Sequence, residues 1–99
     1  MIVISGLFRL DDGVTDEVLD ACRAVMEATQ SEEGCIDYAF SADPLDGQVL
    51  RVFEMWEDEE SLNKHFSTPH VDIFRKAMGA WAMSQREIKK FETATFDTM

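Results

Sequence analysis

The feature that most constrains the fold of this chain is the stretch 49–56, which reads Val-Leu-Arg-Val-Phe-Glu-Met-Trp. Its many β-branched and aromatic residues predict a strand. Alternate side chains of a strand point to opposite sides, and here both sides are mostly apolar. One carboxylate, Glu54, lies on the same side as Val52 and Trp56. Neither face of this strand suits water, so we expect a sheet that is covered on both faces.

The chain has 99 residues, which predicts a single domain over residues 1–99 with enough apolar area for one core. Its formal net charge of -11 disfavours binding to nucleic acid or to an anionic membrane surface. No signal peptide and no apolar run of membrane length are seen, so we expect a cytoplasmic protein. Cys22 and Cys35 have no metal or redox spacing, which predicts that they behave as small buried hydrophobic residues.

The first half of the chain predicts a strand, a helix and a hairpin. Residues 1–10 alternate as a strand, and residues 14–31 carry apolar side chains at helical spacing, with Thr15 or Asp12 as the cap. Residues 35–42 alternate again and lead through a loop at 43–47 into the apolar strand.

The second half predicts two helices and a last strand. Asp58 is expected to cap a short helix, and Pro69 to start another that extends to Trp81. From residue 83 to about 96 the pattern is irregular, because Ile88 and Phe91 are out of phase. We therefore expect a bulge near Lys89–Lys90.

The order strand, helix, strand, strand, helices, strand predicts an α+β fold, the ferredoxin-like split βαβ arrangement with an antiparallel sheet. Helices cover one face of such a sheet. The other face is apolar here, so we expect a second copy of the chain to cover it in a two-fold homodimer.

Two histidines, His65 and His70, are the only ones in the chain and follow the apolar strand closely. Either can transfer protons, but His65 could equally be a hydrogen-bonded residue at a helix end, and His70 a capping residue. They are five residues apart across the break at Pro69, which does not place them reliably on one face. The sequence therefore predicts no metal site.

Glu54 is either a general base or a partner of Arg51, Arg9 or a basic residue of a second chain, and we favour the ion pair. Tyr38 is a packing residue or a polar group at a binding site. Four large aromatic side chains are core residues by default and could also form the walls of a pocket: Trp56, Phe66, Phe74 and Trp81.

A series of short motifs resembles the antibiotic biosynthesis monooxygenase family of the dimeric α/β-barrel superfamily. The motifs are Glu33-Gly34-Cys35-x-x-Tyr38, Glu54-x-Trp56, Leu62-x-x-His65, and Ser67 and His70 with Phe74. They match in order and spacing over nearly the whole chain.

This resemblance implies a homodimer whose two sheets form a barrel, with a pocket between the sheet and the helices of each protomer. It implies a cofactor-independent monooxygenase that oxidises a small aromatic, quinol or polyketide-like substrate with O2 and uses no metal or flavin. The residues expected to be catalytic are His65, His70 and Trp56; those expected to bind substrate are Tyr38, Glu54, Phe66, Phe74 and Trp81.

Two alternatives stay open at this point. The same pocket suits a non-catalytic dimer that binds a small apolar ligand. Haem binding or degradation is less favoured, because haem-degrading relatives carry an asparagine on the first strand and this chain reads Ile4-Ser5-Gly6 there.

Overall fold

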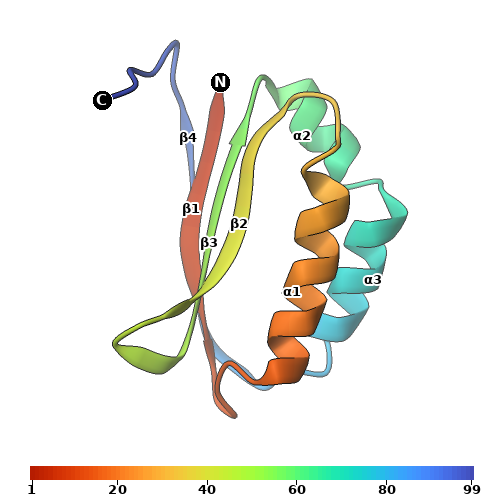
Figure 1. Ribbon diagram of the computed structural model, residues 1–99, viewed down its shortest axis with the longest axis vertical. Coiled ribbons are helices and arrows are strands. Elements are labelled where there is room, and N and C mark those ends of the chain that lie inside the picture. Colours follow the sequence, from red (N-terminus) through yellow and green to blue (C-terminus); the bar gives the residue numbers. More distant parts are fainter.

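A computed structural model describes residues 1–99 and shows a four-stranded antiparallel sheet with three helices on one face (Figure 1). The elements are β1 (Ile2–Leu10), α1 (Asp16–Thr29), β2 (Cys35–Asp43), β3 (Asp46–Trp56), α2 (Glu59–His65), α3 (Pro69–Met78) and β4 (Met83–Glu92). The strands lie in the order β2-β3-β1-β4. The predicted α+β ferredoxin-like fold is confirmed.

Side-chain caps fix where the helices begin. The hydroxyl of Thr15 accepts a hydrogen bond from the Val18 amide and starts α1, as the sequence predicts. Asp58 accepts from the Ser61 amide at the start of α2. Each cap accepts a hydrogen bond from a backbone amide of the first turn and so fixes the residue at which its helix begins.

The core lies between the sheet and the helices, as the face-to-face layers in Figure 1 indicate. Trp56, Leu50 and Leu10 are almost fully buried there. Gly6 leaves no room for a side chain, since a Cβ at this position would lie 2.2 Å from the backbone oxygen of Glu87 on β4. The close approach of β4 to β1 at this point therefore requires glycine.

The opposite face of the sheet is apolar at one end and charged at the other. The strand register places Met55, Val3 and Phe91 in one row across it. Phe53 is 38% exposed and Phe91 is 51% exposed in the single chain. Burial of this face against a second copy stays a prediction.

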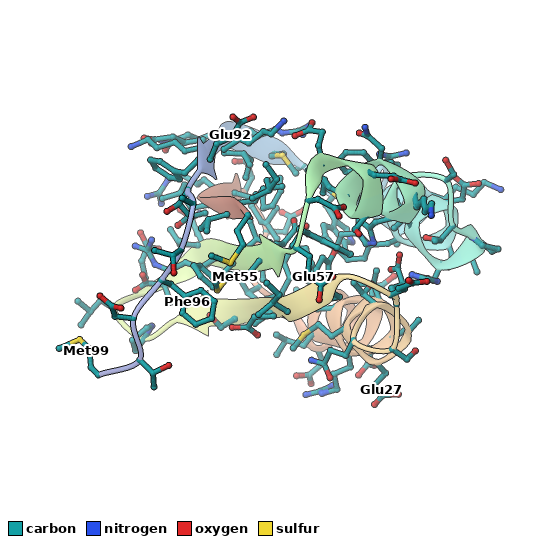
Figure 2. All side chains as sticks on the ribbon, turned by 90° about the horizontal axis from the view of Figure 1, so that it is seen from above. Glu27, Met55, Glu57, Glu92, Phe96 and Met99 are labelled. Carbon is teal, nitrogen blue, oxygen red and sulfur yellow. The ribbon has the colours of Figure 1, made fainter.

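The last residues lie on this open side of the sheet. Figure 2 shows Phe96 and Met99 on the side away from the helices, and Figure 1 agrees. Phe96 is about half exposed. No helix is long and apolar enough to cross a membrane.

Two predicted boundaries, of the hairpin turn and of the last helix, are wrong. The hairpin turn is Pro44–Leu45 alone, because β3 already begins at Asp46. Trp81 lies beyond α3, which ends at Met78 with Gly79 as its C-cap. The physical reason in the second case is that Gly79 has a low helix propensity and lies at the point where the chain turns toward β4.

The bulge predicted at Lys89–Lys90 is also wrong. Pairing of β1 with β4 is regular there, and the irregularity lies at Arg9/Leu10 opposite the start of β4. Ile88 and Phe91 are out of phase because their side chains lie on opposite faces of the sheet: Ile88 packs against the core, and Phe91 lies on the open face. The strand also ends at Glu92 and does not continue to residue 96.

Candidate functional site

The chain brings both histidines onto one carboxylate. Oε2 of Glu32 lies 2.7 Å from Nδ1 of His65 and 2.8 Å from Nε2 of His70. Glu32 comes from the loop between α1 and β2, His65 is the last residue of α2, and His70 lies in the first turn of α3. We call these three residues the Glu32 cluster. Three separate segments of the chain therefore meet at one oxygen atom.

The hydroxyl of Thr68 joins the two helices that carry the histidines. It donates to the carbonyl oxygen of His65 at 2.7 Å and accepts from the amide of Val71 at 3.4 Å. Pro69 then occupies the first turn of α3, where its missing N–H costs nothing. The break between the two helices, which the sequence predicts at Ser67–Pro69, thus places the two imidazole rings side by side, with centroids 6.1 Å apart.

The carboxylate fixes the tautomer of each neutral ring. An ionised carboxylate only accepts hydrogen bonds, so Nδ1 of His65 and Nε2 of His70 both carry their proton when they face Glu32. In the neutral imidazoles, the other nitrogens are then free to accept a proton. For His70 this acceptor is Nδ1.

His65 lies deep in an aromatic environment. It is 2% exposed, and its ring centroid lies 4.8 Å from that of Trp56 and 5.1 Å from that of Tyr38. Burial lowers the pKa of His65, and the hydrogen bond from its ring to Glu32 opposes this shift in part. His70 keeps contact with solvent, since 23% of its side chain is exposed. Of the two histidines, His70 is the one that a ligand can reach.

Glu54 faces the helices and forms no ion pair within the chain, which corrects the pairing favoured from the sequence. Its Oε1 accepts a hydrogen bond from Nε1 of Trp56 at 3.0 Å. Arg51 pairs with Asp43 and Arg9 with Asp46 on the other face of the sheet. Alternation along β3 is the reason, because Arg51 and Glu54 are an odd number of residues apart.

Burial raises the pKa of the Glu54 carboxyl, while the hydrogen bond from Trp56 lowers it by less. Tyr38 pairs with Glu54 across β2 and β3, and its pKa is raised, first by burial and then by the charges of Glu54 and Glu32. Tyr38 is therefore a neutral phenol at ordinary pH. The geometry makes it a wall of the aromatic environment around His65.

Neither cysteine is activated. Burial raises the pKa of Cys22 to about 11. The pKa of Cys35 is also raised to about 11, by burial and by the nearby charges of Glu32, Asp37 and Glu54. Both are therefore protonated near neutral pH and poor nucleophiles. Cys22 is buried as expected, whereas Cys35 is only half-buried.

An apolar hollow of about 260 Å³ lies between α1 and α3, with His70 in its wall. It is lined by Ala21, Ala24, Val25, His70, Ile73, Phe74 and Ala77. The sequence-based expectation placed the pocket between sheet and helices. That space is filled around His65 by Trp56 and Tyr38, and the hollow that His70 borders lies between the two helices.

Three further aromatic residues expected at the site are Phe66, Phe74 and Trp81, and of these Phe66 has its ring centroid 5.8 Å from that of His65. Phe74 lines the hollow and packs against Phe40 and Trp81. Trp81 borders a different hollow, near the start of α1. Phe66 is 41% exposed and lies under the guanidinium of Arg75. Their roles as substrate-binding residues stay predictions, and the structure gives Phe74 the best position of the three.

Sequence reasoning missed Glu32. It stands beside Glu33 just before Gly34, in the loop that follows the predicted helix over residues 14–31. Gly34 takes a positive φ of +84°, and the loop that it closes turns Glu32 inward and leaves Glu33 exposed. No signal in a single sequence distinguishes two adjacent glutamates of one loop.

Comparison with known proteins gives one family. The sequence profile described as "antibiotic biosynthesis monooxygenase" matches residues 1–77. The protein sll1783 of Synechocystis, which is uncharacterized, is 28% identical over 98 residues, covering 99% of this chain and 67% of its own length.

Solved structures of the same shape include a conserved protein from Methanosarcina mazei, with a TM-score of 0.81 and 26% identity, covering 91% of this chain and 89% of that one. Rv0793 from Mycobacterium tuberculosis is similar with a TM-score of 0.84 and 18% identity over 98% of both chains. The second likeness shows a shared fold only.

Proposed function

The chain belongs to the antibiotic biosynthesis monooxygenase family, and from this premise we propose that it oxidises a small aromatic, quinol or polyketide-like substrate with O2. The observation that carries the proposal is the Glu32 cluster beside an apolar hollow. An aromatic substrate of this kind is largely apolar and carries an acidic O–H or C–H group. It needs an apolar wall and one group that accepts a proton.

The reaction starts with removal of that proton. The resulting phenolate or carbanion can transfer one electron to O2, and recombination of the two radicals forms a carbon–oxygen bond in a peroxide. The peroxide takes a proton, and loss of water then breaks its O–O bond and leaves a C=O group. For a CH2 group the balance is CH2 + O2 → C=O + H2O, so the substrate supplies all the electrons and no external reductant is required. The protein has to accept the proton, hold the anion and exclude water.

The geometry supports His70 as the proton acceptor. Glu32 holds its Nε2–H, which leaves Nδ1 as the basic atom, and His70 lines the hollow. When Nδ1 takes up a proton, the adjacent carboxylate stabilises the imidazolium, as in triads in which a carboxylate orients a histidine. His65 donates a second hydrogen bond to the same oxygen and keeps the carboxylate in place.

Oxygen uptake with a panel of hydroquinones and anthrones tests the proposal. We expect uptake by the wild type and a loss of about 100-fold or more in kcat for His70→Gln, because a general base contributes factors of that order. Glu33→Gln is the matched control: it changes the neighbouring glutamate, which is exposed and contacts neither histidine. Absence of uptake on every substrate, or equal rates for His70→Gln and the control, contradicts the proposal.

A second function, binding without turnover, is favoured by the lining of the hollow, which is apolar except for His70. Native mass spectrometry of freshly purified protein separates the two functions. A retained small molecule that is not consumed under O2 supports the binding module and argues against the oxygenase.

We also propose that the working unit is a homodimer joined through the open face of the sheet. The apolar row Met55, Val3 and Phe91, of which Phe91 is exposed, supports this assembly together with the exposed Phe53. Pairing of two such faces removes from water the apolar area that a single chain leaves exposed.

A further inference from the structure

We propose that the Glu32 cluster is a binding site for one divalent transition metal ion of the zinc class. Two imidazole nitrogens and one carboxylate oxygen all lie within 4.8 Å of one another. This donor set, two histidines and one carboxylate, holds zinc or iron(II) in many proteins and leaves coordination positions open. The proposal does not rest on the oxygenase reaction.

The two nitrogen–oxygen distances at Glu32 require only a small adjustment. Around a tetrahedral ion with bonds of about 2.0–2.1 Å, neighbouring ligand atoms are about 3.4 Å apart. The nitrogen–oxygen separations at Glu32 are 2.7 and 2.8 Å, because hydrogen bonds hold these atoms now. An outward movement of about 0.6 Å exchanges each hydrogen bond for a metal bond.

The surroundings favour a cation at this place. The charge of Glu32 acts on Glu54 and both act on Cys35 and Tyr38, so the region carries a negative field. The chain as a whole carries a formal net charge of -11. The cluster is mostly shielded, with side-chain exposures of 3% for His65 and 13% for Glu32, and such shielding strengthens the attraction between the carboxylate and an ion.

The donor set also selects among ions. Imidazole nitrogen suits Zn²⁺, Co²⁺, Ni²⁺ or Cu²⁺, whereas Mg²⁺ and Ca²⁺ require mainly oxygen ligands. An ion on Nε2 of His70 leaves the ring proton on Nδ1, the atom proposed above as the base. Metal binding and proton abstraction by His70 therefore exclude each other.

Titration of the metal-free full chain with Co²⁺ tests the site without any substrate. We expect visible absorption bands that saturate at one ion per chain, displacement by Zn²⁺, and no displacement by Mg²⁺. In Glu32→Gln and His70→Gln the affinity for Co²⁺ should fall by more than about 10-fold. A loss of about 10-fold already follows when a residue that only supports a metal ligand is changed. Circular dichroism confirms that each variant is folded, and Glu33→Gln should bind like the wild type.

Two results overturn the proposal. One is the absence of saturable Co²⁺ binding by the wild type at millimolar concentrations. The other is binding that Mg²⁺ displaces or that Glu33→Gln weakens as much as Glu32→Gln does, which is the behaviour of diffuse attraction to an acidic surface. Because neither result involves oxygen uptake, the metal site and the oxygenase can fail independently.

Discussion

At the scale of single residues, the most unusual environments belong to charged groups placed among aromatic ones. Glu54 lies beside Tyr38 on the neighbouring strand and receives a hydrogen bond from Trp56. The core tolerates this carboxyl because the indole satisfies one oxygen, but burial still disfavours its charge. The stability of the wild type should therefore depend on whether the Glu54 carboxyl is protonated or ionised.

Glu54→Gln should make the protein more stable at neutral pH, by on the order of 1 kcal/mol. The glutamine oxygen can still accept from Trp56, and no buried charge remains. Burial raises the folded-state pKa of Glu54 above its ordinary value of 4.5, so the folded chain keeps this proton to a higher pH than the unfolded chain does. The contribution of Glu54 to stability accordingly falls as pH rises from about 4.5 through the folded pKa, and the variant lacks this pH-dependent contribution.

Urea denaturation at a series of pH values measures this difference. Glu57→Gln serves as the control, because it makes the same chemical change at an exposed position three residues further along the chain. An advantage of Glu54→Gln that stays constant between about pH 4 and pH 7 would show that burial does not shift this carboxyl.

At the scale of elements, the site depends on how loops connect helices and strands. Gly34 leads from the end of α1 into β2 at a φ of +84°, and a Cβ there would lie 2.1 Å from Oγ and 2.5 Å from Cβ of Ser61 on α2. This glycine lets α2 lie against the loop that carries Glu32. The spacing of the Glu32 cluster is therefore set by a close contact between a loop and a helix.

Gly34→Ala should lower the free energy of unfolding by at least about 2 kcal/mol, since it combines a strained backbone with a steric overlap. Gly47→Ala is the control, because a Cβ at that position meets nothing within 4 Å. Thermal and urea denaturation of the two variants give the comparison. Similar midpoints for both would contradict the role assigned to Gly34.

The elements themselves follow from the sequence where local chemistry decides. Thr15 and Asp58 cap the helices as predicted, because a capping side chain acts within three residues. The prediction of a bulge at Lys89–Lys90 failed because it assumed that Ile88 and Phe91 lie on the same face of the strand. In the structure, Phe91 lies on the open face of the sheet. Position in the sheet, and not the local pattern, decides such cases.

The candidate site could be predicted only in part for the same reason. Both histidines were identified, since they are the only ones and belong to the motif series. Their common partner, Glu32, comes from a loop more than thirty residues earlier in the chain. Contacts between residues so far apart in the sequence depend on how α2 and α3 pack against the loop. A single sequence does not directly indicate this packing.

At the scale of the whole molecule, two properties oppose each other. The open face of the sheet is apolar at one end, which favours association, while a net charge of -11 on each chain makes two copies repel. Salt screens the repulsion and leaves apolar contact unaffected or stronger. A dimer joined through this face should therefore become tighter as the salt concentration rises.

Phe53→Lys should weaken the proposed dimer by at least about 10-fold in Kd, because it places a charge in the middle of the contact. The fold should persist, since Phe53 is 38% exposed in the single chain. Leu45→Lys, in the hairpin turn and 96% exposed, is the control. Analytical ultracentrifugation at micromolar concentration measures the fraction of dimer for each variant. A wild type that sediments as a single chain would exclude the assembly.

The sharing of one carboxylate oxygen by two rings has a consequence for mutagenesis. Loss of Glu32 frees both imidazoles, and loss of either imidazole leaves the other with an altered acceptor. The effects of separate substitutions should consequently not sum, and a double-mutant cycle should report strong coupling between positions 65 and 70. A scan that changes one position at a time would count the same loss three times.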